Sequence, residues 1–219
     1  MEYDPARDDH GLPYNPFKAC VVPRPIGWIS TRSLDGIDNL APYSQFQMLT
    51  YDPPIVMFSA NQTPDGRRKD SVVNTEATGE FVWNMATHDL REAVNISSTF
   101  VDSGVDEFEL TGLAKAPSVK TRPPRVADSP IHFECVYMQT LRLPGNTPMG
   151  TVDVVVGRVI LIHIKDEVIN AAGRIDIPKI RPLARLGYYD YTSVDSVFEM
   201  KRPGEGRHQL RGMEGKPDR

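Results

Sequence analysis

The chain has 219 residues, which suits one large domain or two small ones, and 40% of them are hydrophobic while 25% are charged. These fractions are typical of a folded protein and exclude a disordered chain. The formal net charge of -4 gives no reason to expect a nucleic-acid partner. Cys20 and Cys135 are too far apart in the sequence for a metal or redox motif, so we expect two small, reduced core residues.

The ends of the chain are polar. Residues 1–13 carry several charges and no apolar run, so we expect a flexible N-terminus without a signal peptide. No stretch approaches the ~20 apolar residues of a membrane span, and a cytoplasmic protein that does not enter membranes is expected. We predict one domain over residues 14–199 and a polar, flexible tail over 200–219.

The first half of the chain has the pattern of short strands joined by tight turns. Residues 26–31 alternate after an entry segment held extended by prolines, and Gly27 inside this strand predicts a close approach by another backbone or a ligand. Asp35-Gly36 marks a hairpin turn. The continuous apolar run at 55–60 predicts a short buried strand, which Pro53 and Pro54 separate from the strand before it.

Two helices are expected next. Asp70 and Ser71 are both good N-caps for a helix through about Thr78 that Gly79 closes, and Thr87 is the expected cap of a second helix. Residues 102–130 are rich in Gly, Pro, Ser and charge, which indicates an irregular excursion of the same domain.

Two long strands are predicted in the second half. Residues 131–143 alternate and predict one buried face, whereas 151–165 are apolar on both faces, so we expect both faces to be covered, one of them in a dimer interface. Several strands before and after two helices, without regular strand–helix alternation, favour an antiparallel barrel carrying helices over a doubly wound sheet.

The strongest chemical signal is the basic helix start at Arg67-Arg68-Lys69-Asp70-Ser71. A helix N-terminus presents unpaired N–H groups and partial positive charge, and three cationic side chains here would add to it, so the segment suits a phosphate group. A solvated basic turn with an ordinary cap is the alternative. No Gly-x-Gly-x-x-Gly motif follows a strand, which argues against a Rossmann domain.

Taken together, the motifs resemble those of the flavin reductase-like, FMN-binding split-barrel family. The resemblance rests on segments in conserved order between residues 14 and 191, namely 23–31 (PRPIGWIST), 39–46 (NLAPYSQF), 52–59 (DPPIVMFS), 69–74 (KDSVVN), 79–84 (GEFVWN), 157–159 (GRV) with His163, and 182–187 (PLARLG). It implies a mainly β protein with helices, built on a six-stranded antiparallel split barrel. It also implies a homodimer that binds one FMN per subunit near the dimer interface.

The resemblance also implies which residues hold FMN, and it implies no catalytic side chain and no metal. By motif match, the residues that would line the flavin or its ribityl chain are Trp28, Ser30 and Thr31. Those that would meet the isoalloxazine ring are Tyr43, Ser44, Gln45 and Phe46. Those that would serve the ribityl phosphate end are Ser59, Asn61, Lys69, Asp70 and Ser71. Arg68 is an addition to the family pattern and is expected to share the phosphate with Lys69.

Three functions remain open from the sequence. The leading hypothesis is an FMN-dependent oxidoreductase that passes a hydride from NADH or NADPH to FMN and on to a small molecule or a partner monooxygenase. The second is an FMN-binding electron carrier or flavin-storage protein without its own nicotinamide site, and the third is a dimeric scaffold that has lost flavin. Tyr188-Tyr189 stands where many relatives carry glycines, so we expect these rings to narrow access to the flavin.

Overall fold

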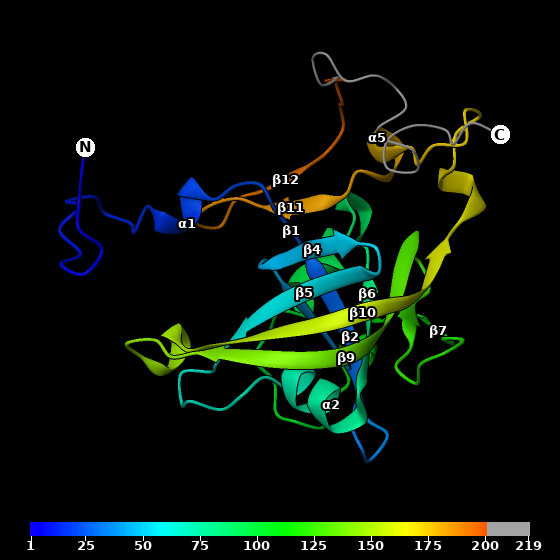
Figure 1. Cartoon of the computed structure of the whole chain (residues 1–219), viewed down its shortest axis with the longest axis horizontal. Coiled ribbons are helices and arrows are strands. Elements are labelled where there is room, and N and C mark those ends of the chain that lie inside the picture. The colour runs from blue at the N-terminus through cyan, green and yellow to red at the C-terminus, as the bar shows by residue number, and fades with distance from the viewer. Residues whose placement is uncertain (201–219) are drawn as a thin grey trace.

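A seven-stranded antiparallel sheet, curled into a barrel, forms the body of the protein in a computed structural model that describes residues 1–200 (Figure 1). All but Met200 of the predicted tail therefore lies outside the described residues. The strands, in the order in which they are hydrogen bonded, are β3 (Asp38–Tyr43), β2 (Gly27–Arg32), β6 (Glu80–Asn84), β9 (Ile131–Leu143), β10 (Val152–Ile164), β5 (Pro54–Asn61) and β4 (Phe46–Tyr51). The predicted antiparallel barrel is confirmed, although the expected number of six strands is one too few for this sheet.

Smaller elements surround the barrel. A three-stranded sheet is made of β1 (Arg24–Pro25), β11 (Leu183–Arg185) and β12 (Tyr191–Ser193), and a two-stranded one of β7 (Lys115–Ala116) and β8 (Arg125–Val126). The α-helices are α1 (Phe17–Cys20), α2 (Asp70–Thr78), α3 (Arg91–Ile96), α4 (Glu107–Thr111) and α5 (Ile177–Ile180). The 3-10 turns are η1 (His88–Leu90), η2 (Pro148–Gly150) and η3 (Asp166–Val168). None of the described helices is long and apolar enough to cross a membrane.

Gly27 has a close neighbour inside its strand as predicted, but the neighbour is a side chain and not the expected backbone or ligand. A Cβ atom at this position would lie 2.9 Å from a ring carbon of Phe46, so only glycine leaves room for that ring. Phe46 in turn stacks on Trp83, with parallel rings whose centroids are 5.3 Å apart. The glycine therefore allows β2 and the start of β4 to pack tightly against each other over the aromatic part of the core.

Helix α2 closes one side of the barrel, and its N-cap precedes both predicted caps. Lys69 has the extended backbone of an N-cap, and the helix starts at Asp70, so the expectation that Asp70 or Ser71 caps it is wrong. The predicted end is confirmed, because Gly79 adopts the left-handed conformation with φ 78°. Val72 and Thr75 are fully buried against the sheet, which anchors the helix and leaves its first turn at the barrel rim.

Strand β9 differs from the single buried face predicted for it. His132 and Glu134 are buried on the face expected to be polar, whereas Leu141 and Leu143 are about half exposed. The reason is topological. β9 pairs with β6 only as far as Val136 and then continues with β10 alone as a projecting hairpin (Figure 1).

The buried carboxylate of Glu134 explains why a polar residue lies inside the first half of β9. It accepts hydrogen bonds from the backbone N–H groups of Val119, Lys120 and Thr121 at 2.6–2.9 Å, and from His163 at 2.6 Å. The loop before β8 is thereby pinned over the second face of the strand. Burial raises the pKa of Glu134, but these donors outweigh it and hold the pKa below its usual value.

Strand β10 is only partly covered within this chain. Asp153, Val155 and Val159 are buried, whereas Ile162 and Ile164, which follow a register shift after Val159, are 48% and 40% exposed. The expectation that both faces are covered is therefore not met by the single chain at this end of the strand.

The two cysteines are free thiols, as expected, but they differ in burial. Cys135 is buried, whereas Cys20 is exposed, so the expectation of a core residue is wrong for Cys20.

Candidate functional site

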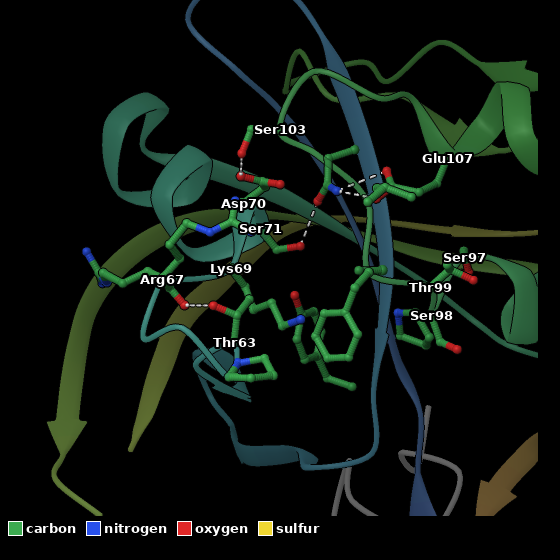
Figure 2. A pocket seen from close by; sticks show the side chains of 18 of the residues that line it. Thr63, Arg67, Lys69, Asp70, Ser71, Ser97, Ser98, Thr99, Ser103 and Glu107 are labelled. Atoms are coloured by element: carbon green, nitrogen blue, oxygen red, sulfur yellow. Dashed lines mark hydrogen bonds between the residues drawn. The ribbon is translucent and has the colours of Figure 1, made fainter. Parts of the chain in front are cut away.

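A cavity of about 420 Å³ lies at the start of α2, where the helix, the end of β3, the turn at residues 63–67 and the loop at residues 97–103 meet (Figure 2). Its wall combines a few apolar groups with many polar ones. It therefore suits a ligand that is itself polar over much of its length.

The basic residues at this helix start have separate roles. Arg67 is exposed and its guanidinium pairs with Asp65 at 2.7 Å. Arg68 is tied down more firmly, since it binds Glu76 through two hydrogen bonds of 2.6 and 2.7 Å and the buried Asp153 at 3.1 Å. Both arginines are thus already neutralised by carboxylates. Arg68 lines the cavity but its charge is committed to structure.

Lys69 is the cation of this segment that makes no ion pair with any described residue. Its side chain is half-buried, and its Nζ atom lies 3.7 Å from the centre of the Phe100 ring. Burial lowers the pKa of Lys69, because desolvation penalises the charged form, although the nearby Asp70 partly opposes the shift. A half-buried ammonium without a counter-ion, next to a helix N-terminus, provides a position for an anion.

The opposite wall of the cavity is held by a chain of hydrogen bonds (Figure 2). Ser71 donates its hydroxyl hydrogen to Asn39 Oδ1 at 2.7 Å, and Asn39 Nδ2 donates to both carboxylate oxygens of Glu107 at 2.9 Å. The backbone N–H of Leu40 also donates to Glu107 at 2.9 Å. Burial raises the pKa of Glu107, against the effect of these donors, and no described cation pairs with it.

Tyr43 contributes an unsatisfied group to the same cavity. The residue is 7% exposed, and its buried hydroxyl has no hydrogen bond of good geometry to any described residue, although it lies next to Ser71. Burial raises the pKa of this phenol, which keeps it protonated. Because a buried hydroxyl without a partner is costly, this atom is a candidate contact for a ligand.

The structure brings together five of the residues predicted from sequence. Those that line the cavity are Tyr43, Arg68, Lys69, Asp70 and Ser71. Asp70 directs its carboxylate to the Ser103 hydroxyl, which donates to it at 2.7 Å. A carboxylate can only accept, so the side chain of Asp70 has no donor to offer a phosphate group, and only its backbone N–H could bind one.

The other predicted residues lie behind or beside this cavity. Trp28 and Ser30 are fully buried, and their donors are already used, by Ser97 Oγ at 3.0 Å and by the Pro124 carbonyl at 2.6 Å. Thr31 is also fully buried and donates to Asn39. The remaining ones that do not line the cavity are Ser44, Gln45, Phe46, Ser59 and Asn61. Their contact with a flavin stays a prediction.

Several residues of the site were not predicted. Asn39 and Glu107 hold one wall, and the loop with Phe100 and Ser103 forms another. Asn39 opened one of the motifs, but nothing in its pattern indicated a buried partner. Glu107 belongs to the stretch expected to be irregular, and no local signal would have placed its carboxylate against β3.

The two tyrosines expected to narrow access lie away from this cavity. Tyr189 lines a second hollow of about 560 Å³, formed mainly by α3 and β12, and its side chain is 93% exposed. Tyr188 does not line either cavity and adopts a left-handed backbone with φ 56°. Their predicted effect on flavin access stays a prediction.

Comparisons with known proteins agree on one family. The family model for the flavin reductase like domain matches residues 19–192. An uncharacterized protein of Aquifex aeolicus is 35% identical over 201 residues, which is 92% of this chain and 100% of the relative. Among solved structures, nitrilotriacetate monooxygenase component B from Bacillus cereus is 26% identical with a TM-score of 0.83 over 91% of this chain and 98% of that one.

A second solved structure supports the fold alone. The 2-nitrobenzoate 2-nitroreductase NbaA of Pseudomonas fluorescens is 23% identical, with a TM-score of 0.79 over 93% of this chain and 97% of that one. The structural likenesses confirm the split-barrel fold expected from the motifs.

Replacing Arg68 by alanine tests whether this arginine is structural. We expect Arg68→Ala to lower the free energy of unfolding by about 1–3 kcal/mol, because hydrogen bonds to Glu76 and the buried Asp153 are lost. Urea denaturation measures the change, with Arg67→Ala as the matched control. The exposed Arg67 pair should leave the midpoint close to that of the wild type. Equal stability of the two variants would contradict the structural role of Arg68.

Proposed function

The chain belongs to the flavin reductase-like domain family, and from that premise we propose that it is an FMN-dependent oxidoreductase that takes a hydride from NADH or NADPH. The observation that carries the proposal is the uncompensated charge of Lys69 at the first turn of α2. A phosphate group bound there would restore the missing counter-charge. The N–H groups of the helix start would add to the attraction.

The residues around the cavity fit FMN in three respects. Lys69 offers a cation for the phosphate, and the buried Tyr43 hydroxyl is free to bond a polar group of the ligand. Ala41, Pro42 and Phe100 supply apolar surface to the same cavity. When bound, FMN supplies the hydride chemistry, so the chain itself has to bind, orient and shield the reacting partners rather than exchange protons with them.

The other predicted contacts remain part of the proposal. Ser44 and Gln45 follow Tyr43 at the turn from β3 into β4, and both are half-buried. Gln45 accepts a hydrogen bond from the Ser59 N–H at 2.8 Å, so these three residues form a continuous edge. Trp28 and Ser30 would act through the backbone that they fix in place, because their side-chain donors are occupied.

We also propose that the active form is a homodimer and that its acceptor is a small molecule or a partner monooxygenase. The half-exposed isoleucines of β10 support the first point, since they leave an apolar strip at the end of this strand. The likeness to nitrilotriacetate monooxygenase component B supports the second, because that protein is by name one component of a monooxygenase.

Reduction by a nicotinamide cofactor is the direct test of the proposal. We expect the purified protein, loaded with FMN, to lose the absorbance of oxidised flavin when NADH or NADPH is added without oxygen. If that absorbance persists with both donors although dithionite bleaches it, the remaining hypothesis is an electron carrier or a flavin-storage protein. If the protein binds no FMN, the remaining hypothesis is a dimeric scaffold.

The role of Lys69 is tested by measuring the affinity for FMN. We expect Lys69→Ala to weaken FMN binding by about 1.5–3 kcal/mol, or roughly 10- to 150-fold, because a hydrogen bond to a charged group is lost. Fluorescence titration measures the change. Riboflavin, which lacks the phosphate, should bind the variant and the wild type equally well. Arg67→Ala, which removes an exposed neighbouring cation, is the matched control.

The dimer is tested by sedimentation velocity over a range of protein concentrations. We expect a dimer whose dissociation is favoured by Ile162→Lys, because the substitution places a charge in the apolar strip of β10. A monomer at every concentration would contradict this proposal.

A further inference from the structure

The cavity has a second recognition element that is separate from Lys69, and it begins at a residue outside the sequence motifs. Glu107 is 4% exposed and lies on α4, a short helix in the irregular stretch of the chain. Its carboxylate meets no described cation and is satisfied by hydrogen bonds from Asn39 and from the N–H of Leu40. The direction of those bonds determines what the cavity can offer a ligand.

A carboxylate accepts hydrogen bonds and does not donate, so the NH₂ group of Asn39 must face Glu107. The amide oxygen of Asn39 consequently faces the other way, toward Ser71 and Thr31. Ser71 has a single hydroxyl hydrogen, and it is donated to that oxygen at 2.7 Å. What the Ser71 hydroxyl has left for the cavity is therefore lone pairs.

The Tyr43 hydroxyl lies next to Ser71 and is the unsatisfied buried group of the cavity wall. A ligand that reaches this pair can offer a donor to Ser71 and accept from Tyr43. A hydroxyl group does both, whereas a phosphate oxygen would meet the lone pairs of Ser71 without a hydrogen between them. The acceptor character of this wall contrasts with the positive charge at Lys69.

We propose that Glu107 is a positioning residue which, through Asn39, holds Ser71 as a hydrogen-bond acceptor for a hydroxyl group of the ligand's sugar-alcohol chain. This inference rests on the proposed FMN function, and it changes the expected role of Ser71 from the phosphate to the polyol. Lys69 then binds the charged end of the ligand, and Ser71, held by Asn39 and Glu107, binds its hydroxyls.

Substitution of Glu107 by glutamine removes the charge but retains the shape. A glutamine oxygen at the Oε2 position can still accept from Asn39 and Leu40, but the glutamine NH₂ group would then lie at the Oε1 position, where it faces the NH₂ group of Asn39 and two donors meet. If its oxygen keeps Leu40, its NH₂ group turns Asn39 over, and the NH₂ of Asn39 then faces Ser71. Ser71 would be converted from an acceptor to a donor toward the cavity.

Three ligands separate the two recognition elements, because FMN, riboflavin and lumiflavin share the ring system but differ in their side chains. Riboflavin lacks the phosphate, and lumiflavin lacks the whole sugar-alcohol chain. In fluorescence titrations we expect Glu107→Gln to lower the ratio of riboflavin to lumiflavin affinity by roughly three- to tenfold, the worth of one hydrogen bond. The ratio of FMN to riboflavin affinity should stay as in the wild type.

Lys69→Ala should give the reverse result, with the FMN-to-riboflavin ratio lowered and the riboflavin-to-lumiflavin ratio kept. Glu109→Gln is the matched control, because it makes the same chemical change on an exposed residue of the same helix. A variant that loses affinity for all three ligands equally, or for none, would overturn the positioning role.

Ser71→Ala keeps the inference testable if Glu107→Gln does not fold, since it leaves the bonds of Asn39 and Leu40 to Glu107 in place. It should lower the riboflavin-to-lumiflavin ratio by itself, and an unchanged ratio would overturn the inference even if FMN still binds. Where both variants fold, Glu107→Gln should cause little further loss in the riboflavin-to-lumiflavin affinity ratio of a protein that already carries Ser71→Ala. A wild-type chain that binds none of the three flavins would overturn the proposed function instead.

Discussion

The site depends on one constraint, which is that the start of α2 is held at the start of β3 by a buried polar network. Ser71 on the helix, Asn39 on the strand and Glu107 on α4 are all less than 10% exposed, and their polar groups satisfy one another. Buried polar groups are costly when one partner is missing, so the three elements can adopt few other arrangements. The positions of Lys69 and Tyr43 follow from this contact.

Two kinds of interaction shape the barrel and the site. Apolar packing of Val72 and of the rings of Phe46 and Trp83 in one core cluster determines where α2 and β4 lie. Hydrogen bonds to charged groups then determine which polar groups face the cavity. As a result, one wall is cationic and the other offers acceptors, an asymmetry that apolar packing alone would not produce.

Local patterns predicted the elements better than they predicted their environments. The strand at 55–60, the end of α2 at Gly79 and the close approach at Gly27 could be read from a few neighbouring residues, since turn and strand preferences are local. The faces of β9 could not, because the cover over Glu134 comes from a loop more than ten residues away in the chain.

The same limit applies to the site. The motif at the start of α2 identified Lys69 and Ser71, but its three cationic side chains look alike in the sequence. Only tertiary contacts with Glu76 and Asp153 show that Arg68 is already paired. Glu107 gave no signal, because its partner Asn39 is 68 residues away.

The two ion pairs of Arg68 have a consequence for the residue that follows it. Arg68 fastens the chain to β10 through Asp153 and to α2 through Glu76, immediately before Lys69. The backbone of Lys69 is thus immobilised whether or not a ligand is present. Binding of an anion there needs to order little more than one lysine side chain, so most of the entropic cost of recognition is met when the protein folds. The cavity is in this sense preorganised by an arginine that does not have to touch the ligand.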